Sequence, residues 1–323
     1  MNRRPLARAL TAPHRCPSRR AHRGTDRGMA VITALLVVMV ATMLVTGLLQ
    51  RQANDVRAVE NALSRSQARQ LILAGLDWSR AVLAADGRRF AVTRPDQLWA
   101  VPVEETRLTQ GDDDRVAVFS GGIDDAQARF NLTNLAVDGE PDVLAVQRLE
   151  RLLTLRGQPP GPALRIAQRI ALAQPNPRAD PVRPALTPML TDVDHVADVE
   201  GVTPQLIEAL RAVAVVLPEA TRLNVNTALP EVIAATVPNL SLGAARALTA
   251  QRDRGAWFND AADFMNRLGP EYQELTSDAF VVNSHWFLVK GAITFERAVI
   301  GTTALVHRGN AASPEIVWIR ESH

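Results

Sequence analysis

Residues 29–49 read MAVITALLVVMVATMLVTGLL, a run of 21 residues that carries no charged side chain. An α-helix rises about 1.5 Å per residue, so this run is long enough to span a hydrocarbon core of about 30 Å. Eight arginines and a single acid, Asp26, precede it in the first 28 residues. Because positive charge before a span holds the N-terminus in the cytoplasm, the sequence predicts that the remainder is exported.

Three interpretations of this segment compete. A cleaved secretory signal has a shorter apolar core, followed by small residues at its cleavage site, whereas QRQA follows here at residues 50–53. A plain signal anchor is the second interpretation. The third is a prepilin-type leader, residues 1–28, which is cut before the apolar run. Arg27-Gly28-Met29 fits this third pattern, and a glycine there is expected to keep the bond between Gly28 and Met29 extended and accessible.

Helical character continues beyond the membrane span. Residues 51–85 contain no proline and one glycine. Apolar residues recur there at three- and four-residue steps, which predicts an amphipathic helix. The participating residues are Val56, Val59, Leu63, Leu73, Leu76 and Leu83. The sequence therefore predicts a transmembrane helix at 29–49 that continues as an amphipathic helix over 50–85.

Strand signals lie at both ends of the remaining chain. Residues 86–115 are expected to form a polar loop. Residues 115–121 and 126–132 alternate around glycine and aspartate pairs and predict a hairpin. Period-two patterns return at 279–289, 292–306 and 315–320. Three late strands would most simply join the early hairpin in one antiparallel sheet.

Residues 141–270 between these strands read as helical, with a proline-rich loop at 174–188. Two helix-hairpin-helix-like units follow the loop. Thr191 is expected to cap the first helix, Thr203 the second, Ser241 and Asp260 later ones.

These patterns predict an α+β fold in which a long N-terminal helix carries a pilin-like antiparallel sheet and a large inserted all-helical domain. The expected boundaries are the leader at 1–28, the helix at 29–85, the first part of the sheet at 86–140, the insertion at 141–270 and the last strands at 271–323.

Charge and motif content narrow the function. The whole chain carries +2 and the leader +7, so residues 29–323 carry −5. The first helix-hairpin-helix-like unit is acidic, which disfavours a nucleic-acid partner. The single cysteine, Cys16, lies in the leader. The sequence shows no P-loop, GxGxxG, GxSxG or HExxH pattern, so we expect no enzyme.

Two internal segments carry a family resemblance: FNLTNL at 130–135 and LNVNTA at 223–228. With the leader and the apolar helix, they resemble the K-type minor pseudopilins of type II secretion systems. The motif residues are interpreted as structural, and they are Asn131, Asn134, Asn224, Asn226 and Thr227. A pilin-like or helix-hairpin-helix membrane protein of a DNA-uptake or type IV pilus system is the alternative.

The resemblance implies that a prepilin peptidase cuts after Gly28 and that Met29 is N-methylated. It implies an inner-membrane subunit with a periplasmic domain in a Gram-negative bacterium. The implied partners are I- and J-type minor pseudopilins at the filament tip, the major pseudopilin and the inner-membrane platform. Most pilin-like proteins resemble one another in a glutamate at the fifth mature position, where this chain has Thr33. Thr33 can bond to its own helix, and we expect it to mark the tip position.

Calcium is the one cofactor that the resemblance suggests. The acidic, aromatic stretch expected for it is missing, since residues 168–188 contain Asp180 as their sole carboxylate. We therefore assign no metal ligand from the sequence.

Overall fold

The computed structural model describes residues 26–109, 116–272, 277–295, 298–309, 311 and 313–322. Leader residues 1–25 lie outside the described residues. The chain divides into two compact units, Met1–Glu60 and Asn61–His323. Helix α1 (Asp26–Arg89) supplies residues to both, and each unit is described by itself.

In the first unit, the apolar part of α1 is exposed along its whole length. Met29 and Leu44, for example, are each 70% exposed. Among the described residues, this is one helix that is long and apolar enough to cross a membrane. The helix begins at Asp26, so the expectation of an extended Gly28–Met29 bond is wrong. One glycine costs a helix about 1 kcal/mol, which does not stop a helix that the apolar run continues.

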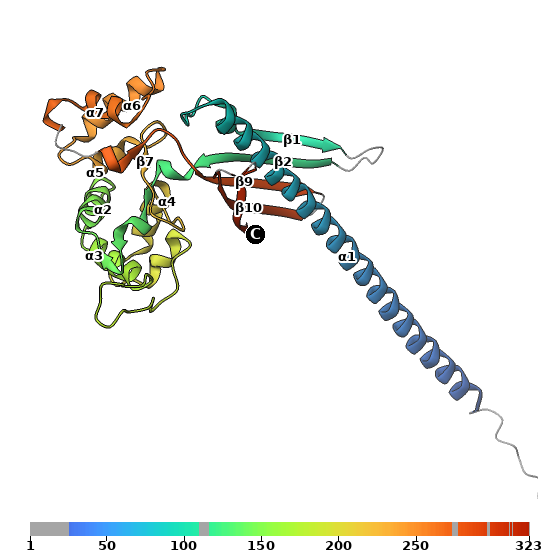
Figure 1. The fold of residues 1–323 in the computed structure, drawn as a ribbon. Helices are drawn as coiled ribbons and strands as arrows, with labels where there is room; N and C mark the ends of the chain where they lie inside the picture. Colours follow the sequence, from blue (N-terminus) through green and yellow to red (C-terminus); the bar gives the residue numbers. More distant parts are fainter. Residues whose placement is uncertain are drawn as a thin grey trace, which may run out of the picture. The chain divides into compact units, whose positions relative to one another are not determined.

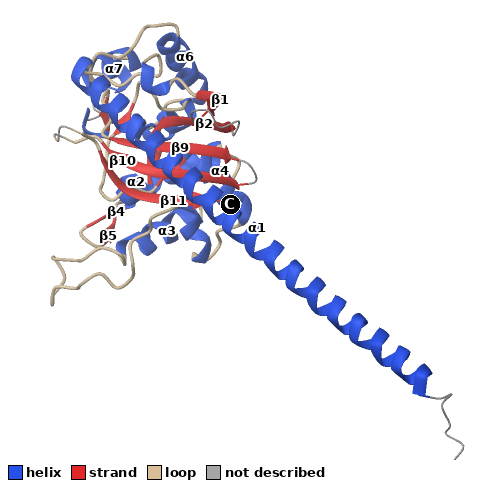
Figure 2. Ribbon diagram, turned by 90° about the vertical axis from the view of Figure 1, so that its right-hand side faces the viewer, coloured by secondary structure: helices blue, strands red, loops and turns tan. Residues whose placement is uncertain are grey.

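The second unit is built on a five-stranded antiparallel sheet with the order β1-β2-β9-β10-β11. The strands span Val103–Thr109, Val116–Asp125, Trp286–Phe295, Ala298–His307 and Glu315–Ser322. Figure 1 shows β1, β2, β9 and β10 side by side, and Figure 2, which also labels β11, shows the sheet crossed by α1. The α1 side chains packed in the same core as the sheet are Ala68, Ile72, Leu76, Val82 and Leu83.

The early strands differ from the prediction. Residues 116–125 form one strand, not the first arm of a hairpin, and the predicted polar loop contains strand β1. Gly121 does not turn the chain. A Cβ atom there would lie 2.7 Å from the carbonyl oxygen of Lys290, so the glycine permits close approach of β2 and β9. Strand β2 ends where the Asp125 side chain accepts a hydrogen bond from the Gln127 amide and starts a 3₁₀ turn.

The late strands are also shifted from their predicted bounds. Gly291 lies within β9, where it pairs with Gly121 and Thr302 on either side. The predicted break near residue 291 is therefore wrong, because a glycine between two close strands is compatible with extended pairing. The turn between β9 and β10 falls at residues 296–297, outside the described residues.

The sheet order confirms that the helices form an insertion, since β2 and β9 are neighbours although residues 126–285 separate them. The insertion contains α2 (Val143–Leu155), α3 (Pro162–Ala171), α4 (Pro204–Val213), α5 (Pro230–Thr236), α6 (Leu242–Asp253) and α7 (Ala261–Leu268). Short strands β3 (Phe130–Asn131), β4 (Ala136–Val137), β5 (Glu140–Pro141), β6 (Ala214–Val215), β7 (Leu223–Asn224) and β8 (Phe280–Val281) connect them. The predicted α+β class, with a long N-terminal helix and an antiparallel sheet, is confirmed.

Local capping signals predicted several helix starts. Thr203, Ser241 and Asp260 each accept a hydrogen bond from the amide three residues ahead. The expected cap at Thr191 is wrong. Asp192 caps the 3₁₀ helix Val193–Asp198 instead, by accepting from the Asp194 amide, because aspartate is an equally good cap and lies one residue closer.

Candidate functional site: a buried polar junction

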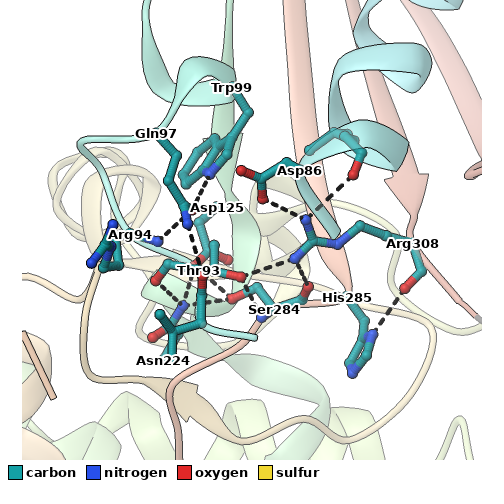
Figure 3. Close-up of polar contacts among 12 residues, drawn as sticks. Asp86, Thr93, Arg94, Gln97, Trp99, Asp125, Asn224, Ser284, His285 and Arg308 are labelled. Carbon is teal, nitrogen blue, oxygen red and sulfur yellow. Dashed lines mark hydrogen bonds and ion pairs between the residues drawn. The ribbon is translucent and has the colours of Figure 1, made fainter. Parts of the chain in front are cut away.

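Asp125, at the end of β2, is the centre of a buried polar cluster. Its Oδ2 accepts hydrogen bonds from the hydroxyls of Ser284 and Thr227, each at 2.6 Å, and from Asn224 Nδ2 at 2.9 Å. Figure 3 shows the side chains of Asp125, Asn224 and Ser284 converging from separate segments. We call this cluster the polar junction; it comprises Asp86, Thr93, Asp125, Asn224, Thr227, Ser284 and Arg308. It joins the sheet, the C-terminal end of α1 and the helical insertion.

The motif at 223–228 supplies the insertion's side of the junction. Asn224 is fully buried and bonds to Asp125, and its Oδ1 accepts from the Asn226 amide at 3.0 Å. Asn226 faces the helices, where its amide group bonds both the N–H and the C=O of Phe258 at 2.9 Å. The two asparagines thus connect the strand β7 segment to the sheet on one side and to the α6–α7 loop on the other.

The motif at 130–135 makes a second connection within the insertion. Asn131 Oδ1 accepts from the Leu217 amide at 3.1 Å, and its Nδ2 donates to the Glu219 carbonyl at 2.8 Å. Asn134 pairs with both backbone groups of Thr221, at 2.7 and 2.9 Å. The structure therefore brings Asn224 and Thr227 into the polar junction and leaves Asn131 and Asn134 outside it.

Arg308, the residue directly after β10, completes the junction, and sequence reasoning did not find it. Its guanidinium lies 3.0 Å from Asp86 and donates to the Thr93 hydroxyl at 2.9 Å and to the Ser284 carbonyl at 2.8 Å. The side chains of Arg308 and Asp86 are 12% and 4% exposed. The pair joins positions 222 residues apart, and no local pattern in the sequence signals such a contact.

The electrostatics of the two acids differ. Burial raises the pKa of the Asp86 carboxyl, and the hydrogen bond and charge of Arg308 act against that rise. Burial also raises the pKa of Asp125, which is opposed by hydrogen bonds from neutral donors, first Ser284 and then Thr227. The Asp125 side chain is thus stabilised by hydrogen bonds from neutral groups, and the Asp86 side chain by its ion pair with Arg308.

The junction does not have the geometry of a hydrolytic triad. The Ser284 hydroxyl donates to Asp125, while His285 Nδ1 lies 2.8 Å from the carbonyl oxygen of Arg308. In the described part of the chain, no histidine is hydrogen-bonded to the Ser284 hydroxyl, so no base is placed to activate it. The arrangement can hold segments together, and we assign it that structural role.

The residues predicted for processing and assembly lie elsewhere, near the start of α1. Thr33 donates its hydroxyl to the carbonyls of Met29 and Ala30, at 3.0 and 3.1 Å. The expected bond of Thr33 to its own helix is therefore present. Gly28 and Met29 lie in the first turns of α1.

The residues at 168–188 do not fit a calcium site. Asp180 is exposed there, and Arg178 and Arg183 bind nearby groups, namely the Asp138 carboxylate at 2.8 Å and the Gly139 carbonyl at 3.1 Å. Across the described ranges, no group of three or more His, Cys, Asp or Glu side chains could hold a metal ion.

A long apolar-to-amphipathic helix on an antiparallel sheet, with helices inserted between two neighbouring strands, defines a pilin-like subunit. Two family models, both described as "Type II secretion system (T2SS), protein K", match residues 128–219 and 223–283. These matches support an assignment of the chain to the protein K family of the type II secretion system.

One curated relative and one solved structure are similar to this chain. The type II secretion system protein K of Pseudomonas aeruginosa is 28% identical over 285 residues, which cover 82% of this chain and 83% of that protein. The fold is similar to a chain in the crystal structure of the GspK-GspI-GspJ complex from enterotoxigenic Escherichia coli. That match has a TM-score of 0.64 and 18% identity, and it covers 82% of this chain and 99% of the other.

Proposed function

We propose that this chain is a minor pseudopilin that caps the tip of a type II secretion pseudopilus, in machinery that exports folded proteins across the outer membrane. The observation that carries the proposal is the insertion of residues 126–285 between two adjacent strands of the sheet, in a protein K relative. Such an insertion adds a helical domain to the subunit. A subunit at the tip of a filament has no subunit above it, so the added domain does not block the place of a neighbour there. The role is structural and not enzymatic.

The proposed partners are the I- and J-type minor pseudopilins. The structurally similar Escherichia coli chain occurs in a complex with GspI and GspJ, and 99% of that chain is covered by this fold. The major pseudopilin, the prepilin peptidase and the inner-membrane platform complete the proposed set. An inner-membrane anchor with its N-terminus in the cytoplasm and a periplasmic domain is supported by the apolar helix and the arginines that precede it.

Secretion and co-purification test this function together. Deletion of the gene should abolish secretion of the system's substrates, and the tagged full-length chain should restore it and co-purify with the I- and J-type subunits. Site-specific crosslinks from the insertion should reach those two subunits. Crosslinks that place the chain at regular intervals along the shaft would overturn the tip assignment.

A DNA-uptake role is the alternative, and the arginine contacts speak against it. In the first helix-hairpin-helix-like unit, Arg211 is bound by Asp194 and Glu208. In the second, buried Arg252 donates to the carbonyls of Val225 and Ala228, and Arg267 binds Asp263. A guanidinium that is paired with a carboxylate, or bonded to carbonyls of the chain, offers less net attraction to a phosphate.

The full-length chain in detergent should therefore show no salt-sensitive DNA binding at physiological ionic strength. Micromolar binding whose affinity falls steeply with added salt would support the DNA-uptake alternative instead.

A further inference from the structure

A hollow of about 140 Å³ lies within the second unit, beside helix α2. Three arginines from separate segments contribute to its lining: Arg129, Arg148 and Arg222. Three guanidinium groups around one small hollow create a local excess of positive charge, because Asp278 is the one acid among the lining residues.

The three arginines differ in whether the chain already provides them with an acceptor. Arg129 forms an ion pair with Asp124 at 3.1 Å. Within the described ranges, no hydrogen bond or ion pair is made by the side chains of Arg148 and Arg222. Other arginines drawn into the fold are bound: Arg252 donates to two carbonyls, and Arg308 binds Asp86.

Arg148 is partly buried without an anionic partner in contact. Burial lowers the pKa of its guanidinium, and the charge of Asp142 acts in the opposite direction. A guanidinium that is partly shielded from water and has no acceptor within the chain loses part of its hydration, and an anion in contact with it would offset that loss. The free energy therefore favours a bound anion at Arg148.

The remaining lining indicates which anion fits. The amide groups of Asn131 and Asn134 are already bonded to the chain, so the free N–H donors come from the two guanidinium groups. A guanidinium donates two parallel hydrogen bonds to the two oxygens of a carboxylate. Asp278 on the lining would repel a doubly charged ion more strongly than a singly charged one.

We propose that this hollow is a binding site for a single carboxylate group, held by Arg148 and Arg222. The group can be an acidic side chain of a neighbouring protein or a free small carboxylate, and the binding chemistry is the same. The proposal does not depend on the pseudopilin assignment.

Thermal unfolding of the full-length chain in detergent tests the site, with acetate as the probe. The Tm in acetate is compared with the Tm in chloride at neutral pH and equal ionic strength. A ligand at ten times its Kd shifts the folding equilibrium about elevenfold, which corresponds to a rise in Tm of about 3 °C for a domain of this size. We expect this rise in the wild type and in the Arg246→Gln control, whose side chain is 64% exposed and outside the hollow. Arg148→Gln should show no rise.

Three outcomes would overturn the proposal. The first is an equal acetate response in the wild type and in Arg148→Gln. The second is a lower Tm of Arg148→Gln in chloride, which would show that Arg148 already has stabilising contacts. The third is a larger Arg148-dependent rise with inorganic phosphate than with acetate. Arg222 lies at an exposed position. Arg222→Gln should raise the acetate concentration that gives half of the Tm rise about tenfold, because the variant loses one charged hydrogen bond to the carboxylate.

Discussion

The amide nitrogen of Asn224 lies 2.9 Å from Asp125 Oδ2, although 99 positions separate the two residues. This bond joins the helical insertion to the last residue of β2. Asp125 depends on it together with the hydroxyls of Ser284 and Thr227. The junction is therefore a shared set of acceptors and donors, so the removal of one member takes a hydrogen bond from at least one other member.

We predict that Asn224→Ala lowers the free energy of unfolding by about 2–4 kcal/mol, because the change removes a donor to buried Asp125 and the acceptor of the Asn226 amide. Urea unfolding of the full-length chain in detergent measures it. Asn283→Ala at a nearby exposed position should change the free energy by less than about 0.5 kcal/mol. Equal effects of the two variants would show that the junction contributes little.

Arg308→Gln should lower the free energy of unfolding by about 3–5 kcal/mol, because it leaves the Asp86 carboxylate buried without its cation. Asp86→Asn alone should also destabilise the fold. The double variant should be more stable than the sum of the two single effects predicts, since neither buried charge then remains. Additive effects in this double-mutant cycle would contradict a direct interaction.

Gly28→Val should leave the precursor uncut but still inserted in the membrane. The leader junction is changed, while the apolar helix from Met29 onward is not. Intact-mass analysis of membrane-purified protein should give a wild-type chain that begins with N-methylated Met29 and a variant that retains residues 1–28. A wild-type chain that begins near Ala53, or one that is never cut, would exclude the prepilin-type leader.

Thr33→Glu should give no gain in assembly and should reduce insertion. In lipid, a carboxylate at this depth is unfavourable unless a cation meets it, and a subunit that enters the filament first has no preceding subunit to supply an N-terminal charge. Thr33 instead bonds to carbonyls of its own helix. Recovery of the complex with the I- and J-type subunits, and secretion, measure the effect. Improved incorporation of Thr33→Glu would argue against the tip position.

Chelation should leave the fold unchanged. The segment 174–188 is held by contacts within the chain, among them Asn176 with Glu140 at 2.7 Å and Arg178 with Asp138 at 2.8 Å. Excess EDTA, followed by dialysis, should shift the Tm of the purified chain by less than about 1 °C, because these contacts between protein groups need no ion. A fall of several degrees that calcium reverses would require a metal site that these residues do not suggest.

Local features of the fold could be read directly along the chain. The apolar run, the amphipathic continuation and the caps at Thr203, Ser241 and Asp260 depend on residues three or four positions apart, or on uninterrupted composition. Such interactions are complete within one segment, so their residue patterns carry the prediction. The asparagines of the two motifs were also found, through their resemblance to a family.

Pairing between distant segments could not be read in this way. Gly121 signalled a turn, and the predicted strands broke near residue 291, whereas Gly121 and Gly291 pair with each other in two strands that lie close together. No local sequence pattern indicates the ion pair between Arg308 and Asp86. No local pattern indicates that Arg148 and Arg222 line one hollow beside α2. Their roles depend on which side chains the folded chain places within reach, because hydrogen bonds and charge act over a few ångströms of space and not over positions in a sequence.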